Sequence, residues 1–310
     1  MQLPSITIQK DGPIPMENNG YSCYMNSAFQ ALLPTFDVLI AKYLHNEHQF
    51  NEPAWKLLNF FHQSFVTRSQ ISIIDRLNSF SNIKYFGSEL NINKQEDAHE
   101  FLHSLLNKLA EEFQRITDEH SQSVNLIKSH YQIRYESRAI CDNCHKSNMK
   151  NPVIAEEFGL LLEICGDFQT MLANSLMQKI ECYNCENCGL KGGTAQMKAN
   201  IINLPKYLIV SIKRFSWDAS YQPCKIEDAV DVQENIQLPG NIDSERVKYN
   251  LISIIAHSGQ TNKGHYIAYV KMGRQWYRAN DQCITKLKFS VVLSEVKKKN
   301  YVQIYEMRYN

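Results

Sequence analysis

The sequence lacks an excess of charge of either sign, and it has no long hydrophobic run. Its 310 residues carry 33 Lys and Arg against 32 Asp and Glu, a net charge of +1, whereas general nucleic-acid binders have a clear basic excess. No apolar stretch approaches the roughly 20 residues that span a bilayer, and the first residues lack the apolar core of a signal peptide. We therefore expect a folded protein that binds neither nucleic acid nor membranes.

Glycine and proline are also scarce, at 12 and 9 residues, so long flexible linkers are not expected, and from its length the chain is expected to form one large domain with a subdomain, or two domains. Apolar residues at helical spacing predict helices at Leu39–Leu44, Trp55–Phe65, Ile71–Phe80 and, most clearly, Gln95–Leu109. Alternating and β-branched residues predict strands further along. These strands are Leu160–Ile164, Leu208–Lys213, Leu251–Ala256, Tyr266–Val270 and Tyr301–Tyr305. Helices followed by strands indicate an α+β protein whose helical part packs on an antiparallel sheet.

The nine cysteines are an odd number, and five of them crowd into two clusters. A secreted protein would more often have an even, dispersed set that forms disulfides. We therefore expect an intracellular, reducing compartment, the cytoplasm or nucleus, in which the thiols serve a metal or catalysis. The cysteines are Cys23, Cys141, Cys144, Cys165, Cys182, Cys185, Cys188, Cys224 and Cys283.

The two clusters contain C-x2-C pairs, which together offer the four thiolates of a closed tetrahedral zinc site. The first pair is Cys141–Cys144. In the second cluster we prefer Cys185–Cys188, because Gly189 follows it and glycine adopts the positive φ that such a turn needs. Cys182 in place of the last cysteine is the alternative for this site, and buried free thiols are the alternative to a metal. We expect a structural Zn²⁺ held between two β-hairpin tips.

The segment around Cys23 carries the strongest catalytic signal. Asparagine and glycine end a loop just before it, and a helix is predicted to begin at the cysteine. The apolar residues that follow at helical spacing are Met25, Ala28, Phe29 and Leu32. Unpaired N–H groups and the dipole at a helix start favour a thiolate. The same groups can face an oxyanion, and the side chain of Asn18 can fold toward the same point.

The candidate base is His265, in a strand that leads into a hairpin with its turn at Met272-Gly273. A tight turn there makes His265 and Asn280, which are equally far from it, direct cross-strand neighbours. An amide at that distance can accept the ring N–H and orient the imidazole. His257 has no such neighbour, and we expect it to be structural.

Together these segments resemble the ubiquitin-specific proteases, papain-like thiol hydrolases of the deubiquitinase group. Gly20–Gln30 matches most of the family's Cys box, G-N-T-C-Y-M-N-S-x-x-Q, and Gln95–Phe101 matches Q-x-D-A-x-E-F. Leu204–Phe215 matches L-P-x-x-L-I-x-x-x-K-R-F, and Ser258–Asp281 matches the His box. The resemblance runs in the family's motif order from Asn18 to Tyr305.

The resemblance implies a right-hand architecture with a helical thumb, a β-sheet palm and β fingers that carry zinc at their tips. It also implies a single catalytic domain over residues 1–310, in which we place the thumb at about 16–124, the fingers at 125–205 and the palm at 206–310. Tyr21 and Ser22 depart from the usual residues before the cysteine, which affects local loop packing and leaves the chemistry in place.

The resemblance also implies the roles of single residues. Asn18 matches the oxyanion-hole asparagine, Cys23 the nucleophile and His265 the base. Asn280 matches the third member of the triad. Asp281 matches a second acidic residue that supports catalysis in some members.

The resemblance also implies which residues contact the substrate. Asp97 and Glu100 match carboxylates that receive the basic C-terminal tail of ubiquitin, and their spacing predicts that they share one helix face. Tyr266, next to the candidate base, is expected to contact the substrate as well. The predicted function is hydrolysis of isopeptide bonds at the C-terminal glycine of ubiquitin by a monomer acting on ubiquitinated proteins. The alternatives are a catalytically weak ubiquitin-binding scaffold and the same chemistry on another ubiquitin-like modifier.

Overall fold

The computed structural model of the protein does not describe every residue. The described residues are 12–35, 72, 84–85, 88–89, 94–119, 125–147, 152–240, 246–261 and 263–308. The helices expected at Leu39–Leu44 and Trp55–Phe65, and all of Ile71–Phe80 except Ser72, lie outside these residues. Within the described ranges, no helix has both the length and the apolar character needed to cross a membrane.

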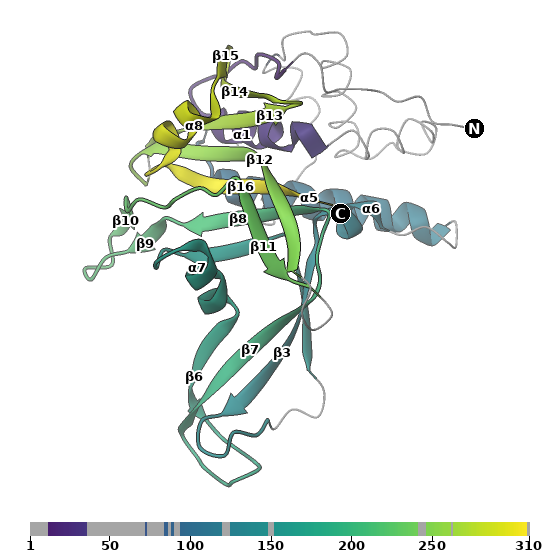
Figure 1. Ribbon diagram of the computed structural model, residues 1–310, viewed down its shortest axis with the longest axis vertical. Helices are drawn as coiled ribbons and strands as arrows, with labels where there is room; N and C mark the ends of the chain where they lie inside the picture. Colours follow the sequence, from purple (N-terminus) through teal and green to yellow (C-terminus); the bar gives the residue numbers. More distant parts are fainter. Residues whose placement is uncertain are drawn as a thin grey trace.

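The centre of the molecule is an eight-stranded sheet (Figure 1). Its neighbours are antiparallel except for the parallel pair β5 and β8. In spatial order the strands are β15 (Cys283–Leu287), β14 (Gln275–Asn280), β13 (Gly264–Met272), β12 (Arg246–Gly259), β16 (Asn300–Met307), β8 (Tyr207–Lys213) and β5 (Leu160–Glu163), and β11 (Asn235–Pro239) pairs with β12. Each of the five strands predicted from the sequence falls in this sheet, so the α+β class is confirmed.

Helices cover both faces of this sheet, because the strands are apolar on both sides. On β8, Tyr207 and Ile209 join one buried cluster, whereas Leu208 and Val210 join the other. The first cluster contains residues of α1, α5 and α6, and the second contains residues of α7 and α8. The helices are α1 (Cys23–Leu32), α5 (Ala98–Glu119), α6 (Leu126–Tyr131), α7 (Phe168–Ser175) and α8 (Phe289–Val296), and the 3-10 helix η2 (Leu33–Thr35) follows α1.

Helix α5 confirms the apolar stripe that was read from the sequence, with different ends. Every stripe residue is at most 2% exposed: Ala98, Phe101, Leu102, Leu105, Leu106 and Leu109. The helix begins at Ala98 instead of Gln95 and continues to Glu119. The start moves because Asp97 accepts the backbone N–H groups of His99 and Glu100 at 2.8 and 3.1 Å. Asp97 is therefore the N-cap of α5. The spacing had predicted that Asp97 and Glu100 share a helix face, but Asp97 lies before the first helical residue.

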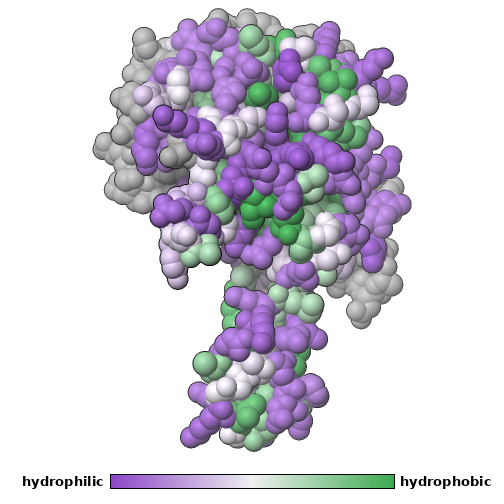
Figure 2. Space-filling view, turned by 90° about the vertical axis from the view of Figure 1, so that its left-hand side faces the viewer, coloured by the Kyte–Doolittle hydropathy of each residue, from purple (hydrophilic) through white to green (hydrophobic). Residues whose placement is uncertain are grey.

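A second, four-stranded sheet projects from the body of the molecule (Figure 1), and Figure 2 shows it as a narrow extension with mixed hydrophilic and hydrophobic side chains. Its strands, in order, are β4 (Val153–Glu157), β3 (Ile133–Cys141), β7 (Gly193–Asn203) and β6 (Met177–Tyr183). This sheet lies in the stretch expected to form the fingers, whose limits at 125 and 205 remain predictions. Strand β5 and helix α7, inside the same stretch, pack with the large sheet.

Two short strand pairs complete the described structure. The pair β9 (Phe215–Trp217) and β10 (Pro223–Lys225) forms a hairpin after β8, and β1 (Lys84–Tyr85) pairs with β2 (Ser88–Glu89). Helix α1 packs against β13 and α5. As a result, the start of α1, the start of β13 and the residues before α5 meet at one place.

Candidate active site

Helix α1 begins at Cys23, as the sequence predicted. The thiol is 1% exposed and occupies the first turn, where four backbone N–H groups have no partner within the helix. These N–H groups and the helix dipole stabilise negative charge on sulfur. The residue type and its position thus suit a nucleophile.

The loop before α1 is held by the side chain of Asn18. Its Oδ1 accepts the N–H groups of Gly20 at 2.8 Å and Ser22 at 3.2 Å, and Gly20 has φ +92. Its Nδ2 donates to Oδ2 of Asp281 at 2.8 Å. The carbonyl oxygen of the amide is therefore turned into the loop, and its NH2 group is turned toward Asp281.

The hairpin that carries the histidine has a register displaced by two residues from the predicted one. Val270 faces Tyr277 and Met272 faces Gln275, so the turn is at Gly273-Arg274. The pairing ends at Ala268 and Ala279, and the prediction that His265 and Asn280 are direct cross-strand neighbours is wrong. Gly273 has φ +60. A two-residue hairpin turn places a residue with positive φ first in the loop, so the turn begins at Gly273 instead of Met272.

His265 and Asn280 are in contact nevertheless, because both side chains extend beyond the end of the paired strands. Nε2 of His265 lies 2.6 Å from Oδ1 of Asn280. An amide oxygen only accepts, so this ring nitrogen carries the hydrogen, and the other nitrogen is left for the thiol of Cys23. The contact fixes the tautomer in the way a catalytic base requires.

Thiol and imidazole favour each other's charged forms. Burial raises the pKa of the Cys23 thiol, but hydrogen bonds from His265, from the backbone of Tyr266 and from Gln95 outweigh it, so the pKa lies below its ordinary value. The hydrogen bond to Cys23 raises the pKa of His265 to about 9 against the effect of burial, with a further contribution from Asn280. The contact therefore favours a thiolate–imidazolium pair over the neutral thiol and imidazole.

Asp281 links the loop, the helix and the histidine. Its Oδ2 is 3.7 Å from Nε2 of His265 and accepts the Asn18 amide, while its Oδ1 accepts Nδ2 of Asn26 at 2.6 Å. Asp281 has φ +50, which turns its side chain out of the strand direction. The role of Asn26 was not predicted, although it stands three residues after Cys23 and a polar residue in a buried helix turn needs a partner.

Gln95 is a second residue that the sequence analysis left without a role. Its Nε2 lies 3.4 Å from Sγ of Cys23 and also donates to the carbonyl of Gly264, while the Gly264 N–H donates to its Oε1 at 3.3 Å. Gln95 thus connects the segment before α5 to Cys23 and to the start of β13. The only signal in the sequence was its place in the Gln95–Phe101 motif.

The three residues expected to contact the substrate, Asp97, Tyr266 and Glu100, differ in their exposure and in their hydrogen-bond partners. The second carboxylate oxygen of Asp97 accepts the hydroxyls of Tyr266 at 3.1 Å and Tyr301 at 2.8 Å, so both oxygens have partners within the protein. Tyr266 is 5% exposed and its hydroxyl is used on Asp97. Glu100, in the first turn of α5, is exposed.

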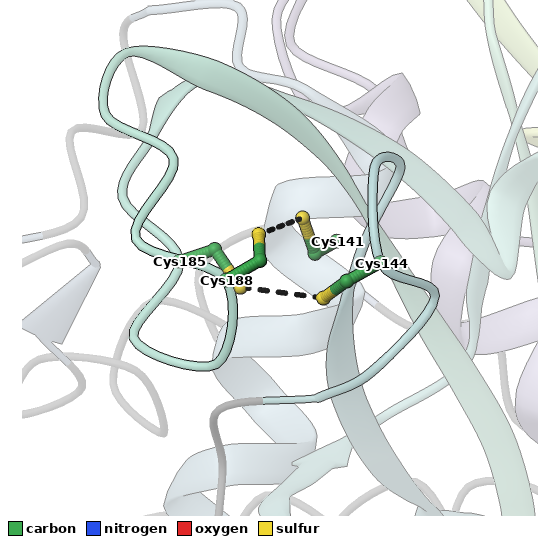
Figure 3. A group of neighbouring side chains, drawn as sticks. All are labelled: Cys141, Cys144, Cys185 and Cys188. Atoms are coloured by element: carbon green, nitrogen blue, oxygen red, sulfur yellow. Dashed lines mark hydrogen bonds between the residues drawn. The ribbon is translucent and has the colours of Figure 1, made fainter.

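Four cysteines meet at the far end of the projecting sheet (Figure 3). The Sγ atoms of Cys141, Cys144, Cys185 and Cys188 all lie within 4.8 Å of one another, with Cys141 to Cys188 at 4.0 Å and Cys144 to Cys185 at 3.6 Å. A tetrahedral zinc site with Zn–S bonds of about 2.3 Å requires S···S separations of about 3.8 Å. Cys182 is exposed and is not part of this group.

The two turns that carry these cysteines are alike. The N–H of the residue after each pair donates to the carbonyl of the first cysteine at 2.9 Å, from His145 to Cys141 and from Gly189 to Cys185. Both residues have positive φ, +56 and +72, and the expectation for Gly189 is confirmed. The turns belong to the β3–β4 and β6–β7 hairpins, so two hairpin tips present the thiols to one point.

The chemistry available at the start of α1 is nucleophilic attack on an acyl carbon. An activated thiol, an oriented imidazole and nearby N–H donors are the three parts that acyl transfer through a thioester needs. They come from α1 with the loop before it and from β13, which lies far along the chain. The same site contains no second nucleophile among the described residues that contact His265.

Comparisons with known proteins agree with this geometry. Residues 15–305 match the family model of the ubiquitin carboxyl-terminal hydrolases. Ubiquitin carboxyl-terminal hydrolase 24 of Mus musculus is 26% identical over 88% of this chain and 12% of its own length, and ubiquitin carboxyl-terminal hydrolase 25 of Arabidopsis thaliana is 26% identical over 94% of this chain and 48% of its own. The chain thus spans between about an eighth and a half of these relatives.

The fold is also that of solved structures. The SAGA DUB module of Ubp8, Sgf11, Sus1 and Sgf73 bound to monoubiquitin contains a chain with TM-score 0.79 and 22% identity, matched over all of this chain and 72% of that one. The module bound to ubiquitin aldehyde gives TM-score 0.78 at 23% identity, with the same coverage. This confirms the expected right-hand fold. The protein belongs to the ubiquitin carboxyl-terminal hydrolase family.

Proposed function

We propose that the protein is a deubiquitinase, a thiol isopeptidase that hydrolyses the bond between the C-terminal glycine of ubiquitin and a lysine amine. The observation that carries this proposal is the contact of Cys23, His265 and Asn280 at the start of α1 in a member of this hydrolase family. The solved structures with the same fold include ones bound to monoubiquitin and to ubiquitin aldehyde. The substrate is thus the extended glycine-ended tail of ubiquitin.

In the first step the Cys23 thiolate attacks the terminal carbonyl carbon, and the carbonyl electrons move onto oxygen. The Asn18 NH2 group and the N–H groups at the start of α1 are the donors for this oxyanion. One such donor contributes about 2.7–4 kcal/mol to transition-state stabilisation in comparable sites. Asp281 fixes the donor by accepting its other hydrogen, through the 2.8 Å contact.

In the second step the tetrahedral intermediate collapses, the C–N bond breaks, and the imidazolium of His265 gives its proton to the departing lysine amine. The acyl group remains on Cys23 as a thioester. The neutral imidazole then takes a proton from water, the resulting hydroxide attacks the thioester, and the ubiquitin carboxylate leaves as the thiol is restored. Asn280 keeps the ring in one orientation through both proton transfers.

The pH dependence of turnover tests this pairing. Since the pKa of His265 is raised to about 9, kcat/KM measured with a ubiquitin C-terminal amide is expected to fall above about pH 9, where the imidazolium is lost. Asn280→Ala removes a hydrogen bond that raises this pKa, so its alkaline limb is expected at lower pH. An alkaline limb that stays in place in Asn280→Ala would show that another group controls it.

Recognition of the basic ubiquitin tail is proposed to depend mainly on Glu100, with Asp97 holding the site together. Glu100→Ala is expected to raise KM by about tenfold, the effect of one lost charged hydrogen bond, and to leave thermal stability unchanged. Asp97→Ala is expected to lower stability by about 0.5–2 kcal/mol for the lost N-cap, and more for the two unpaired tyrosine hydroxyls. Steady-state kinetics and thermal unfolding of both variants measure the effects on KM and on stability separately. Equal losses of stability in the two variants would contradict the different roles proposed for Glu100 and Asp97.

We propose that Cys141, Cys144, Cys185 and Cys188 hold a structural Zn²⁺, because the spacing of their sulfurs suits a tetrahedral thiolate site. The ion would contribute binding free energy to folding and take no part in the thiol chemistry. Cys188→Ser is expected to lose zinc, measured by elemental analysis, and to lower the midpoint of thermal unfolding by at least about 5 °C. The matched variant Cys182→Ser is expected to keep both, and a drop of equal size there would place the metal elsewhere.

The function is tested with ubiquitin that carries a C-terminal electrophile. We expect it to form a stoichiometric adduct, located at Cys23 by mass spectrometry of the digested protein. Binding of ubiquitin without an adduct would instead favour a catalytically weak scaffold. Preferential labelling by the same electrophile on another ubiquitin-like modifier would show that this modifier, and not ubiquitin, is the substrate. We further propose a monomer in a reducing compartment of the cell, where a thiolate nucleophile stays unoxidised.

A further inference from the structure

Helix α5 carries two histidines, His99 and His103, that have no role in the proposed hydrolysis. They are four residues apart, so they lie on one face of the helix, and their ring centroids are 4.1 Å apart with an interplanar angle of 48°. Imidazoles at this spacing on one helix face form the pair of ligands used in helical zinc sites. The pair lies on the turns of α5 that follow the N-cap.

Both rings face a cavity of about 530 Å³ where the projecting sheet meets the body of the molecule. Figure 1 shows the sheet of β3 and β7 extending away from the large sheet. The wall on the side of the projecting sheet includes Tyr135, Ser137, Glu157 and Met197. The cavity is large enough for an ion with its water ligands, and the Glu157 carboxylate adds a hard oxygen donor to its lining.

The two rings are held in different ways. Nδ1 of His99 lies 2.7 Å from Oγ of Ser211, which is 1% exposed, so this ring is oriented by a buried hydroxyl and has Nε2 left for a ligand. Nε2 of His103 is buried and has no hydrogen-bond partner. A buried polar atom without a partner costs free energy, and an ion on this nitrogen would remove the penalty. Burial and the neighbouring His99 lower the pKa of His103 to about 3, so this ring is neutral, the form that binds metals.

We propose that His99 and His103 form a two-imidazole site for a divalent transition-metal ion of the Zn²⁺ class, with Ser211 as the hydrogen-bonded support of the first ligand. Imidazole is a good ligand for Zn²⁺, and metal-bound histidines usually place their other ring nitrogen against an oxygen, as His99 does here. Water ligands from the cavity complete the coordination. The inference does not depend on the proposed hydrolysis or on its substrate.

The experiment is calorimetric titration of Zn²⁺ into the full chain, after one equivalent has been bound to the four-cysteine cluster and excess metal removed. We expect one further equivalent to bind the wild type. His103→Leu is expected to weaken that binding by at least about tenfold, and Ser211→Ala by roughly 10–100-fold, the usual effect of losing a supporting contact. His130→Gln, which changes a histidine on the neighbouring helix α6, is the matched control and is expected to bind as the wild type does.

The leucine variant is chosen because it keeps the fold. It replaces an unpaired buried nitrogen with an apolar side chain of similar size, so thermal unfolding of His103→Leu without added metal is expected at or above the wild-type temperature. The proposal is overturned if His103→Leu binds the further equivalent as tightly as the wild type. It is equally overturned if the wild type binds no further equivalent below about 1 mM Zn²⁺, because the two rings are then only stacked core side chains.

Discussion

Cys23→Ser is expected to lower kcat/KM for a ubiquitin C-terminal amide by about 10⁴-fold or more. A serine hydroxyl at this position has a far higher pKa than the thiol, and His265, whose imidazolium is stabilised by the thiolate, cannot form the same ion pair with it. The remaining contacts are unchanged in shape, so ubiquitin binding should persist. Initial rates with a fluorogenic ubiquitin amide and a binding isotherm with free ubiquitin measure the two quantities separately.

The matched control is Cys283→Ser, which changes an exposed thiol on β15. Cys283 directly faces Asn280 in the strand ladder, so this variant reports any general disturbance near the triad while leaving the nucleophile intact. We expect its rate to stay within a few-fold of the wild type. If Cys23→Ser retained a rate close to that of Cys283→Ser, the nucleophile would have to be another group.

Asn18→Ala is expected to depress kcat by about 10²–10³-fold, or about 2.7–4 kcal/mol of transition-state stabilisation, with a much smaller change in ubiquitin binding. The side chain loses its NH2 group, which is the proposed oxyanion donor and the partner of Asp281. The charge on the carbonyl oxygen develops only as the thiolate attacks, so the loss falls on the rate. Single-turnover kinetics with saturating enzyme report the chemical step directly.

Asn19→Ala separates this role from support of the loop. Oδ1 of Asn19 accepts the N–H groups of Tyr21 at 3.1 Å and Ser22 at 3.2 Å, which resembles the loop contacts of Asn18. A merely structural effect would therefore appear in both variants. We expect Asn19→Ala to keep kcat within about tenfold of the wild type, and equal losses in the two variants would move the oxyanion donor to the backbone.

Several parts of the site could be predicted because their signals are local. The start of α1 at Cys23 follows from the loop residues before it and the apolar spacing after it, and the buried stripe of α5 follows from its periodicity. The four-cysteine cluster follows from two short spacings, and Gly189 marks the second turn by its backbone freedom. Each of these signals lies within a short stretch of the sequence.

The hairpin register and the role of Asp97 were not predicted correctly from the local sequence, although one residue in each case indicated the right answer. The hairpin register was missed by two residues because Gly273 was taken as the second turn residue, whereas its positive φ makes it the first. Asp97 was assigned to a helix face, although aspartate is a preferred N-cap and the backbone N–H groups of Glu100 and His99 use it in that way.

By itself the sequence determined the α+β class and singled out Cys23 as the proposed nucleophile, His265 as the proposed base and the metal-type cysteines, because residue type and short spacing already limit the chemistry. Only the tertiary structure decided which side chains meet. It brings Gln95 to the thiol of Cys23 and Asn26 to Asp281, and it uses Asp97 to join α5 to two tyrosines. These partners are separated by long stretches of chain, and a long-range hydrogen bond exists only when packing of the sheet and helices has placed both groups within about 3 Å.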